Sequence, residues 1–177
     1  MKTIRTFIAI NFDDAVKLYL RSAQAKIKTI SRNGNFTREE NLHLTLVFLG
    51  EISFAQIEQV KQAMEAITTQ SFELTLSKIG RFKRQDGDIV WVGVVQNQML
   101  NSIFNELFSY LKAAEFKLES RVYKPHLTIA RKVVFNEGLG SLPTDDIKTK
   151  IDHVSLMKSE NLSGKLTYTE IHKKILS

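Results

Sequence analysis

The sequence contains no cysteine, and it has only 2 prolines and 1 tryptophan among its 177 residues. Without thiols the chain can form no disulfide, thiolate nucleophile, iron–sulfur cluster or cysteine-based zinc site. No apolar run approaches the ~18 residues of a membrane span, and Arg5 interrupts the apolar stretch near the N-terminus. We therefore expect no membrane segment, no secretory signal and, by default, a cytoplasmic location.

The composition is that of an ordinary globular protein, with 43% hydrophobic and 25% charged residues. These proportions exclude a disordered or coiled-coil chain. Lysine and arginine number 25 against 19 acidic residues, which gives a net charge of +6. Such a charge suits an anionic partner such as nucleic acid, and it equally suits plain solubility. The length predicts a single domain over residues 1–177, and nothing in the sequence requires more than a monomer.

Hydrophobic patterning predicts an α+β fold with mostly antiparallel sheet. The helices are expected to begin at Asp13, at the capping box of Ser53 and Gln56, and at Asn101. Residues 135–147 are predicted to form a loop. A doubly wound parallel sheet is the alternative, although no predicted strand is followed by a glycine-rich phosphate loop. The strands are expected over residues 3–11, 42–49, 72–79, 88–95, 126–133, about 150–158 and 165–175.

Two near-identical tetrapeptides stand out because the chain has only 4 histidines. Residues 43–46 read His-Leu-Thr-Leu, and residues 126–129 read His-Leu-Thr-Ile. One such motif on a strand is usually plain surface, but its duplication indicates an internal repeat. The chain is therefore predicted to consist of two related halves that divide near residues 84–88, each contributing one motif.

The spacing within each motif determines which side chains project together. Residues i and i+2 of a strand share one face. His43 therefore projects with Thr45, and His126 projects with Thr128. If the two halves face each other across a groove, two imidazoles and two hydroxyls converge on one point.

Paired imidazoles suit concerted general acid–base catalysis, because one can be neutral while the other is protonated near neutral pH. The near symmetry of the motifs leaves open which histidine is the acid. The threonine hydroxyls can donate hydrogen bonds to phosphate oxygens, and Arg131 could add positive charge. By strand parity, however, Arg131 lies opposite Thr128 unless the strand bulges. No third ligand completes a metal site around His43 and His126, and no serine elbow indicates a hydrolase triad.

The two motifs and their flanks resemble the two-histidine (2H) phosphoesterases. The nearest branch is the RNA 2′,3′-cyclic phosphodiesterases, also called 2′-5′ RNA ligase-like proteins. The similarity lies in residues 41–50 (Asn-Leu-His-Leu-Thr-Leu-Val-Phe-Leu-Gly) and in residues 123–131 (Tyr-Lys-Pro-His-Leu-Thr-Ile-Ala-Arg). Further similarities are the segments 7–10 and 90–93, Ser159 and Tyr168.

This resemblance implies two pseudo-symmetric lobes of antiparallel sheet, with helices on the outer faces and a central groove lined by the motifs. It also implies hydrolysis of RNA 2′,3′-cyclic phosphate ends, or of 2′,3′-cyclic nucleotides, to 2′-phosphates, without metal or cofactor. By the same resemblance His43 is the proton donor and His126 the proton acceptor. Thr45 and Thr128 hold the phosphate oxygens, and Arg131 lies near the phosphate.

An aromatic side chain is expected to stack on the terminal base, as is common for single-stranded RNA. Phe48 and Tyr123 are the candidates because each neighbours a motif. Phe48 has an alternative place in the core, since it shares strand parity with Leu44 and Leu46. Trp91 lies in an apolar strand and is expected in the core.

Two other functions remain open at this level. One is a 2′-5′ RNA ligase acting on tRNA halves, in which a 5′-hydroxyl replaces water in the same proton transfers. The other is a non-catalytic module that binds RNA ends in a basic groove.

Overall fold

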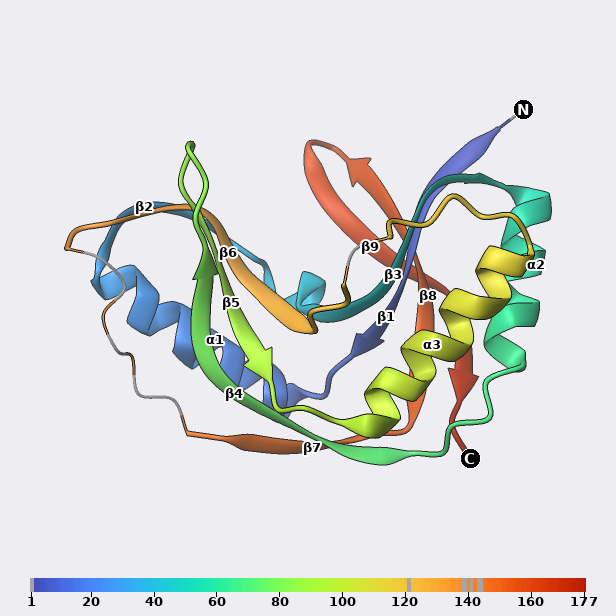
Figure 1. The fold of residues 1–177 in the computed structure, drawn as a ribbon. Helices are drawn as coiled ribbons and strands as arrows, with labels where there is room; N and C mark the ends of the chain where they lie inside the picture. Colours follow the sequence, from blue (N-terminus) through green and yellow to red (C-terminus); the bar gives the residue numbers. More distant parts are fainter. Residues whose placement is uncertain (1, 121, 138–139, 141, 143–144) are drawn as a thin grey trace.

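The computed structural model describes residues 2–120, 122–137, 140, 142 and 145–177. Within them the chain forms two antiparallel β-sheets and three α-helices (Figure 1). The predicted α+β fold with antiparallel sheet is confirmed, and the doubly wound alternative is wrong. Part of the loop predicted over residues 135–147 lies outside the described residues.

The two sheets, here called sheet A and sheet B, contain strands from both ends of the chain. Every pairing within them is antiparallel. Sheet A has the order β3-β1-β8-β9, with β3 His43–Ser53, β1 Thr3–Asn11, β8 His153–Leu162 and β9 Lys165–Ile175. Sheet B has the order β2-β6-β5-β4-β7, with β2 Ser31–Phe36, β6 His126–Phe135, β5 Asp88–Val94, β4 Phe72–Phe82 and β7 Ile147–Ile151.

The helices begin at polar caps that satisfy their first free N–H groups. Helix α1 is capped by the Asp13 carboxylate, and the predicted capping box of Ser53 and Gln56 opens α2. Helix α3 starts before the predicted Asn101 because the Asn97 side chain accepts from the backbone of Leu100. The bounds are α1 Asp14–Thr29, α2 Phe54–Glu65 and α3 Gln98–Ala113, with a 3-10 turn, η1, at Glu39–Asn41.

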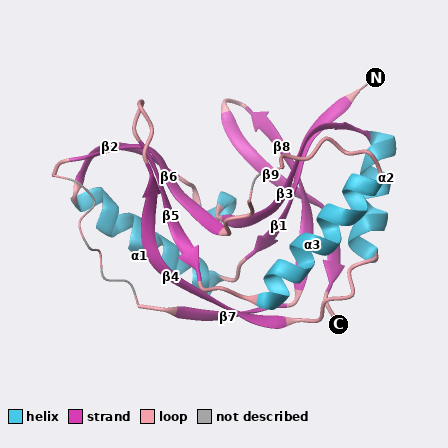
Figure 2. Cartoon of the chain, in the orientation of Figure 1, coloured by secondary structure: helices cyan, strands magenta, loops and turns pink. Residues whose placement is uncertain are grey.

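Each sheet buries one face against helices and leaves the motif side chains on the other. Helix α1 contacts β2 and β6 of sheet B, whereas α2 and α3 contact each other and β3 of sheet A (Figure 2). Leu44 and Leu127 are fully buried in the core, while the neighbouring histidines are only half-buried. The i, i+2 parity of each motif therefore places histidine and threonine opposite the core.

The two sequence halves exchange elements between the sheets. Strand β4 precedes the predicted dividing point at residues 84–88, yet it pairs with β5 in sheet B. Strands β8 and β9 follow that point, yet they lie in sheet A, where β8 pairs with β1 and β9 pairs with β8. Each sheet thus places its motif strand beside the first strand of the same half, and then a strand of the other half (Figure 1). The boundary between the sheets is not a boundary in the sequence.

Strand β2 is absent from the predicted strands because its sequence, Ser-Arg-Asn-Gly-Asn-Phe, has no apolar alternation. It forms an edge of sheet B, where pairing with β6 satisfies its backbone. Within the described residues no helix combines the length and the apolar character that crossing a bilayer requires.

Candidate active site

The first motif holds its histidine through both ring nitrogens. His43 opens β3, and its Nδ1 lies 2.7 Å from the backbone oxygen of Asn41. Its Nε2 lies 2.9 Å from Oγ1 of Thr45. Because a carbonyl can only accept, Nδ1 carries the proton, and Nε2 of the neutral ring accepts from the Thr45 hydroxyl. The buried Asn41 donates in turn from its side chain to the Leu166 carbonyl of β9, at 2.9 Å.

The second motif orients its histidine in the same way. His126 opens β6, and its Nδ1 lies 2.6 Å from the Lys124 carbonyl oxygen. Among the described residues Nε2 of His126 has no hydrogen-bond partner. In both motifs, therefore, a carbonyl two residues before the histidine fixes the tautomer and leaves Nε2 for chemistry.

A β-bulge follows the threonine of the first motif. On β1, Ile8 is opposite Val47 and Ala9 is opposite Thr45, so Leu46 has no partner of its own. Such an extra residue reverses the parity of the strand beyond it. Phe48 is consequently 59% exposed and lies on the face of His43. The alternative placement of Phe48 in the core is wrong.

The second motif has the same bulge at the equivalent place. On β5, Val90 is opposite Ala130 and Trp91 is opposite Thr128, which leaves Ile129 as the extra residue. Arg131 is exposed beyond the bulge and shares the face of Thr128. The bulge that Arg131 requires in order to reach a phosphate at the motifs is therefore present.

Electrostatics connects the two motifs. The pKa of His43 is lowered from its ordinary value of 6.5, first by burial and then by the positive charges of Arg131 and His126, while the bond to the Asn41 carbonyl opposes the shift. Charges act with this effect only at short range through a partly buried site. Strands β3 and β6 also contact each other directly. The two motifs thus lie within electrostatic range of each other, on strands that touch.

Aromatic side chains pack beside each histidine. On sheet A the rings of Phe7 and Tyr168 lie 4.8 Å and 5.3 Å from the His43 ring. On sheet B the rings of Phe82 and Trp91 lie 5.1 Å and 6.3 Å from the His126 ring. Neither Phe7 nor Phe82 was predicted to flank a histidine, because the position of each ring depends on the register between strands. The two histidines are therefore flanked by flat apolar surfaces.

Trp91 corrects a second expectation, since it is half-buried and does not belong to the core. Its neighbours Val90 and Val92 are fully buried, so Trp91 points to the opposite face, with Thr128. A Cβ at Gly80 would lie 2.2 Å from the indole ring. Only glycine at that position lets the ring lie flat against β4.

Tyr123 is not an open platform for a base. Its ring stacks on Phe104 of α3, with centroids 4.2 Å apart and an interplanar angle of 3°. Its hydroxyl donates to the backbone oxygen of Thr45 at 3.1 Å, and burial raises the pKa of the phenol. The assignment of Tyr123 to base stacking is therefore corrected, whereas Phe48 keeps an exposed ring.

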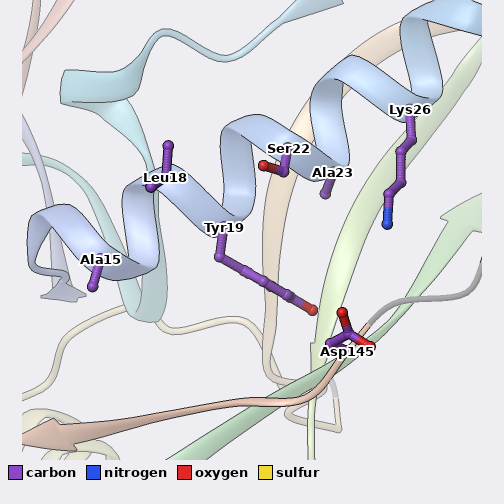
Figure 3. A pocket seen from close by; sticks show the side chains of 7 residues that line it. All are labelled: Ala15, Leu18, Tyr19, Ser22, Ala23, Lys26 and Asp145. Carbon is purple, nitrogen blue, oxygen red and sulfur yellow. The ribbon is translucent and has the colours of Figure 1, made fainter.

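Other concave features lie away from the motifs. A cavity of about 460 Å³ runs along α1, and none of its lining residues is a predicted site residue (Figure 3). Among the described residues there is no group of three or more histidine, aspartate or glutamate side chains placed to hold a metal ion.

Comparison with known proteins identifies one family for this chain and solved structures with the same fold. A sequence model of the 2′-5′ RNA ligase superfamily matches residues 14–162. The RNA 2′,3′-cyclic phosphodiesterase of Thermotoga maritima is 30% identical over 176 residues, which cover 98% of this chain and 93% of that protein. The protein of the same name from Archaeoglobus fulgidus is 27% identical, with 72% of each chain covered.

Solved structures share the whole fold. LigT of Escherichia coli complexed with 3′-AMP superimposes with a TM-score of 0.84 at 24% identity, covering 100% of this chain and 99% of that one. The same protein complexed with NADP+ gives a TM-score of 0.82 at 25% identity, with 99% of each chain covered. The resemblance read from the two motifs is thereby confirmed.

Proposed function

The chain belongs to the 2′-5′ RNA ligase superfamily, and we propose from this premise that it hydrolyses RNA 2′,3′-cyclic phosphate ends to 2′-phosphates. The observation that carries the proposal is a pair of equally oriented histidines, one from each sheet, that open two strands in contact with each other. The curated relatives described above act, by their names, on the same kind of substrate.

The reaction needs one proton removed from water and one delivered to the leaving oxygen. His126 takes a proton from water through Nε2 while the water oxygen bonds to phosphorus. The bond from phosphorus to the ribose 3′-oxygen breaks, and His43 gives its Nε2 proton to that oxygen. The products are a 2′-phosphate and a 3′-hydroxyl, and the two histidines exchange protons with solvent before the next turnover.

The remaining motif residues stabilise charge on the phosphate. Once Nε2 of His43 is protonated it no longer accepts from Thr45, which frees the threonine hydroxyl to donate to a phosphate oxygen. Thr128 donates similarly from the other sheet. Arg131 lies beyond the bulge on the same face and neutralises charge that develops in the transition state. The exposed Phe48 ring stacks on the terminal base.

The substrate charge also supports His43 as the acid. In the free protein the positive charges of Arg131 and His126 help to lower the pKa of His43. A bound phosphodiester places a negative charge among these groups and thereby favours the protonated imidazole. Binding of the substrate thus favours the protonated form of His43 that the reaction requires.

The test is product analysis with an RNA oligonucleotide that ends in a 2′,3′-cyclic phosphate. We expect quantitative conversion to the 2′-phosphate in the presence or absence of excess EDTA. Loss of activity with chelator would contradict metal-independent chemistry, and a 3′-phosphate product would contradict the assignment of the leaving oxygen.

The family also supports a second function, the joining of RNA ends through a 2′-5′ linkage, because a 5′-hydroxyl can replace water in the same transfers. Comparing hydrolysis and joining rates on matched tRNA halves separates the two reactions. Tight binding without turnover, retained after His43→Asn, would instead identify a binding module. The monomeric state and the cytoplasmic location stay predictions.

A further inference from the structure

Two side-chain hydroxyls bond to equivalent backbone oxygens in the two motifs. The Tyr123 hydroxyl donates to the carbonyl of Thr45 at 3.1 Å. The Thr37 hydroxyl donates to the carbonyl of Thr128, also at 3.1 Å. Thr45 and Thr128 occupy the third position of their motifs. The structure therefore contains the same contact twice, once at each motif.

The two contacts cross from one motif to the other. Thr37 precedes His43 in the chain, yet it bonds to the second motif. Tyr123 precedes His126, yet it bonds to the first motif. We call these two contacts the crossed hydroxyl pair. Each bond therefore holds the segment that leads into one motif against the other motif.

The donors themselves are held firmly. The Tyr123 ring lies parallel to Phe104 of α3, so its hydroxyl has little freedom. The backbone N–H of Thr37 donates to the Ile129 carbonyl at 2.9 Å, and its own carbonyl accepts from the Gln24 amide at 2.7 Å. Each donor of the crossed hydroxyl pair is thus fixed beside one sheet, Tyr123 beside α3 and β3 and Thr37 beside α1 and β6. The short segment that follows each donor leads to the motif of the other sheet.

Gln24 extends this network to the bulge of the second motif. The side chain is only 7% exposed, and its Nε2 also donates to the Ile129 carbonyl at 2.9 Å. Ile129 is the extra residue that turns Arg131 onto the motif face. The Gln24 amide therefore donates one hydrogen to Thr37 and one to Ile129. These two bonds hold the bulge in place, since the loss of either would leave a buried polar group without a partner.

We propose that the crossed hydroxyl pair sets the spacing between the two motifs, so that Tyr123 and Thr37 are positioning residues that hold His43 and His126 on opposite sides of one phosphorus atom. This inference rests on the proposed function for its catalytic consequence. In this proposal each residue acts through the backbone of a motif threonine and not by contact with the substrate.

The kinetic test removes one hydroxyl at a time. Tyr123→Phe and Thr37→Val keep the shape of each side chain and delete its donor. A misplacement of about 1 Å can cost on the order of 10²-fold in rate, so we expect kcat to fall about tenfold or more, with KM nearly unchanged. Thr37→Ser keeps the hydroxyl and should restore kcat. Tyr110→Phe removes an exposed hydroxyl on α3 and should leave kcat unchanged.

A second readout does not depend on activity. The pKa of His43 senses the distance to His126 and Arg131. If the crossed hydroxyl pair sets that distance, NMR titration of the free protein should show a higher pKa for His43 in Tyr123→Phe and in Thr37→Val, and no change in Tyr110→Phe. This experiment tests the spacing even if the wild-type protein turns over no cyclic phosphate.

The outcomes separate cleanly. A lower kcat together with a raised His43 pKa supports the proposal. Folded variants that keep wild-type kcat and His43 titration overturn it. A lower kcat with an unchanged titration also overturns it, because the hydroxyls would then act only locally. If one variant does not fold, as judged by circular dichroism, the other tests the same spacing from the opposite motif.

Discussion

The two motifs use one scaffold and differ at one decisive position. Both begin a strand with histidine, orient it by a carbonyl two residues earlier, and bulge directly after the threonine. In each, the fifth residue after the histidine lies beyond the bulge on the motif face. That residue is Phe48 in sheet A and Arg131 in sheet B.

This difference shows how a duplicated site can divide its work. An exposed aromatic ring offers a stacking surface, whereas a guanidinium offers charge to a phosphate. The surroundings differ accordingly. His43 is hydrogen-bonded to Thr45, and Asn41, whose carbonyl orients the His43 ring, is hydrogen-bonded to β9. The His126 ring is oriented by the carbonyl of the exposed Lys124. Under the proposed function the shared parts serve proton transfer, and the differing parts distinguish the base from the phosphate.

The largest expected effect tests what the motifs share. His43→Gln and His126→Gln should each lower kcat by roughly 10²–10⁴-fold, the usual contribution of a general acid or base. His172→Gln is the control, because that ring pairs with Glu65 on the surface. Kinetics on a cyclic-phosphate RNA check the result. A large loss in only one of the two motif variants would break the equivalence of the motifs.

The next effect tests the position at which they differ. Arg131→Gln should lower kcat by about 10²-fold, as expected for a lost transition-state charge contact. Lys132→Gln changes the adjacent exposed cation and should have little effect beyond added salt dependence. Equal losses in both variants would mean that Arg131 contributes only general positive charge.

Substitution of Phe48 should raise KM, whereas substitution of Arg131 lowers kcat. Stacking on a base contributes roughly 1–3 kcal/mol, so Phe48→Ala should raise KM about tenfold or more with little change in kcat. Phe54→Ala is a matched control, since Phe54 is also 59% exposed but lies on α2. A KM that is unchanged in Phe48→Ala, measured on the same RNA, would assign base binding to another residue.

The smallest effect concerns the electrostatic coupling between the motifs. Removing the charge of Arg131 by Arg131→Gln should raise the pKa of His43, because that charge disfavours the imidazolium. The limb of the kcat/KM profile that reports the pKa of His43 should move to higher pH with it. NMR titration of the free protein gives the same quantity directly. A fall in the His43 pKa would contradict the predicted contact.

The fold class and the motif faces could be predicted from the sequence, because alternation and i, i+2 parity are local properties. The bulges could not, since they arise from register against β1 and β5 and become visible only when strands pair. For this reason the sequence left two places open for Phe48 and wrongly predicted Trp91 in the core. For the same reason strand parity placed Arg131 on the face opposite Thr128. Strand β2 was missed because a polar edge strand carries no hydrophobic signal.

The sequence also did not predict which residues the two halves bring together. Tyr123 neighbours the second motif in sequence but bonds to the first, and Thr37 does the reverse. No pattern within one segment encodes such a contact. The histidines and threonines themselves were accessible, since duplication of a rare residue in a fixed pattern is a signal that needs no structure.

The exchange of strands β4 and β8 between the sheets has a consequence for how this site can diversify. The motif strand, the first strand and the exchanged strand of each sheet are arranged as they would be in a strand-swapped homodimer, with one histidine from each subunit. In such an assembly a rotation axis relates the subunits, and every substitution appears twice. The equivalent positions of the two motifs could then not hold an arginine in one and a phenylalanine in the other. Joining both copies into one polypeptide removes that restriction and lets each side of the phosphate acquire its own chemistry.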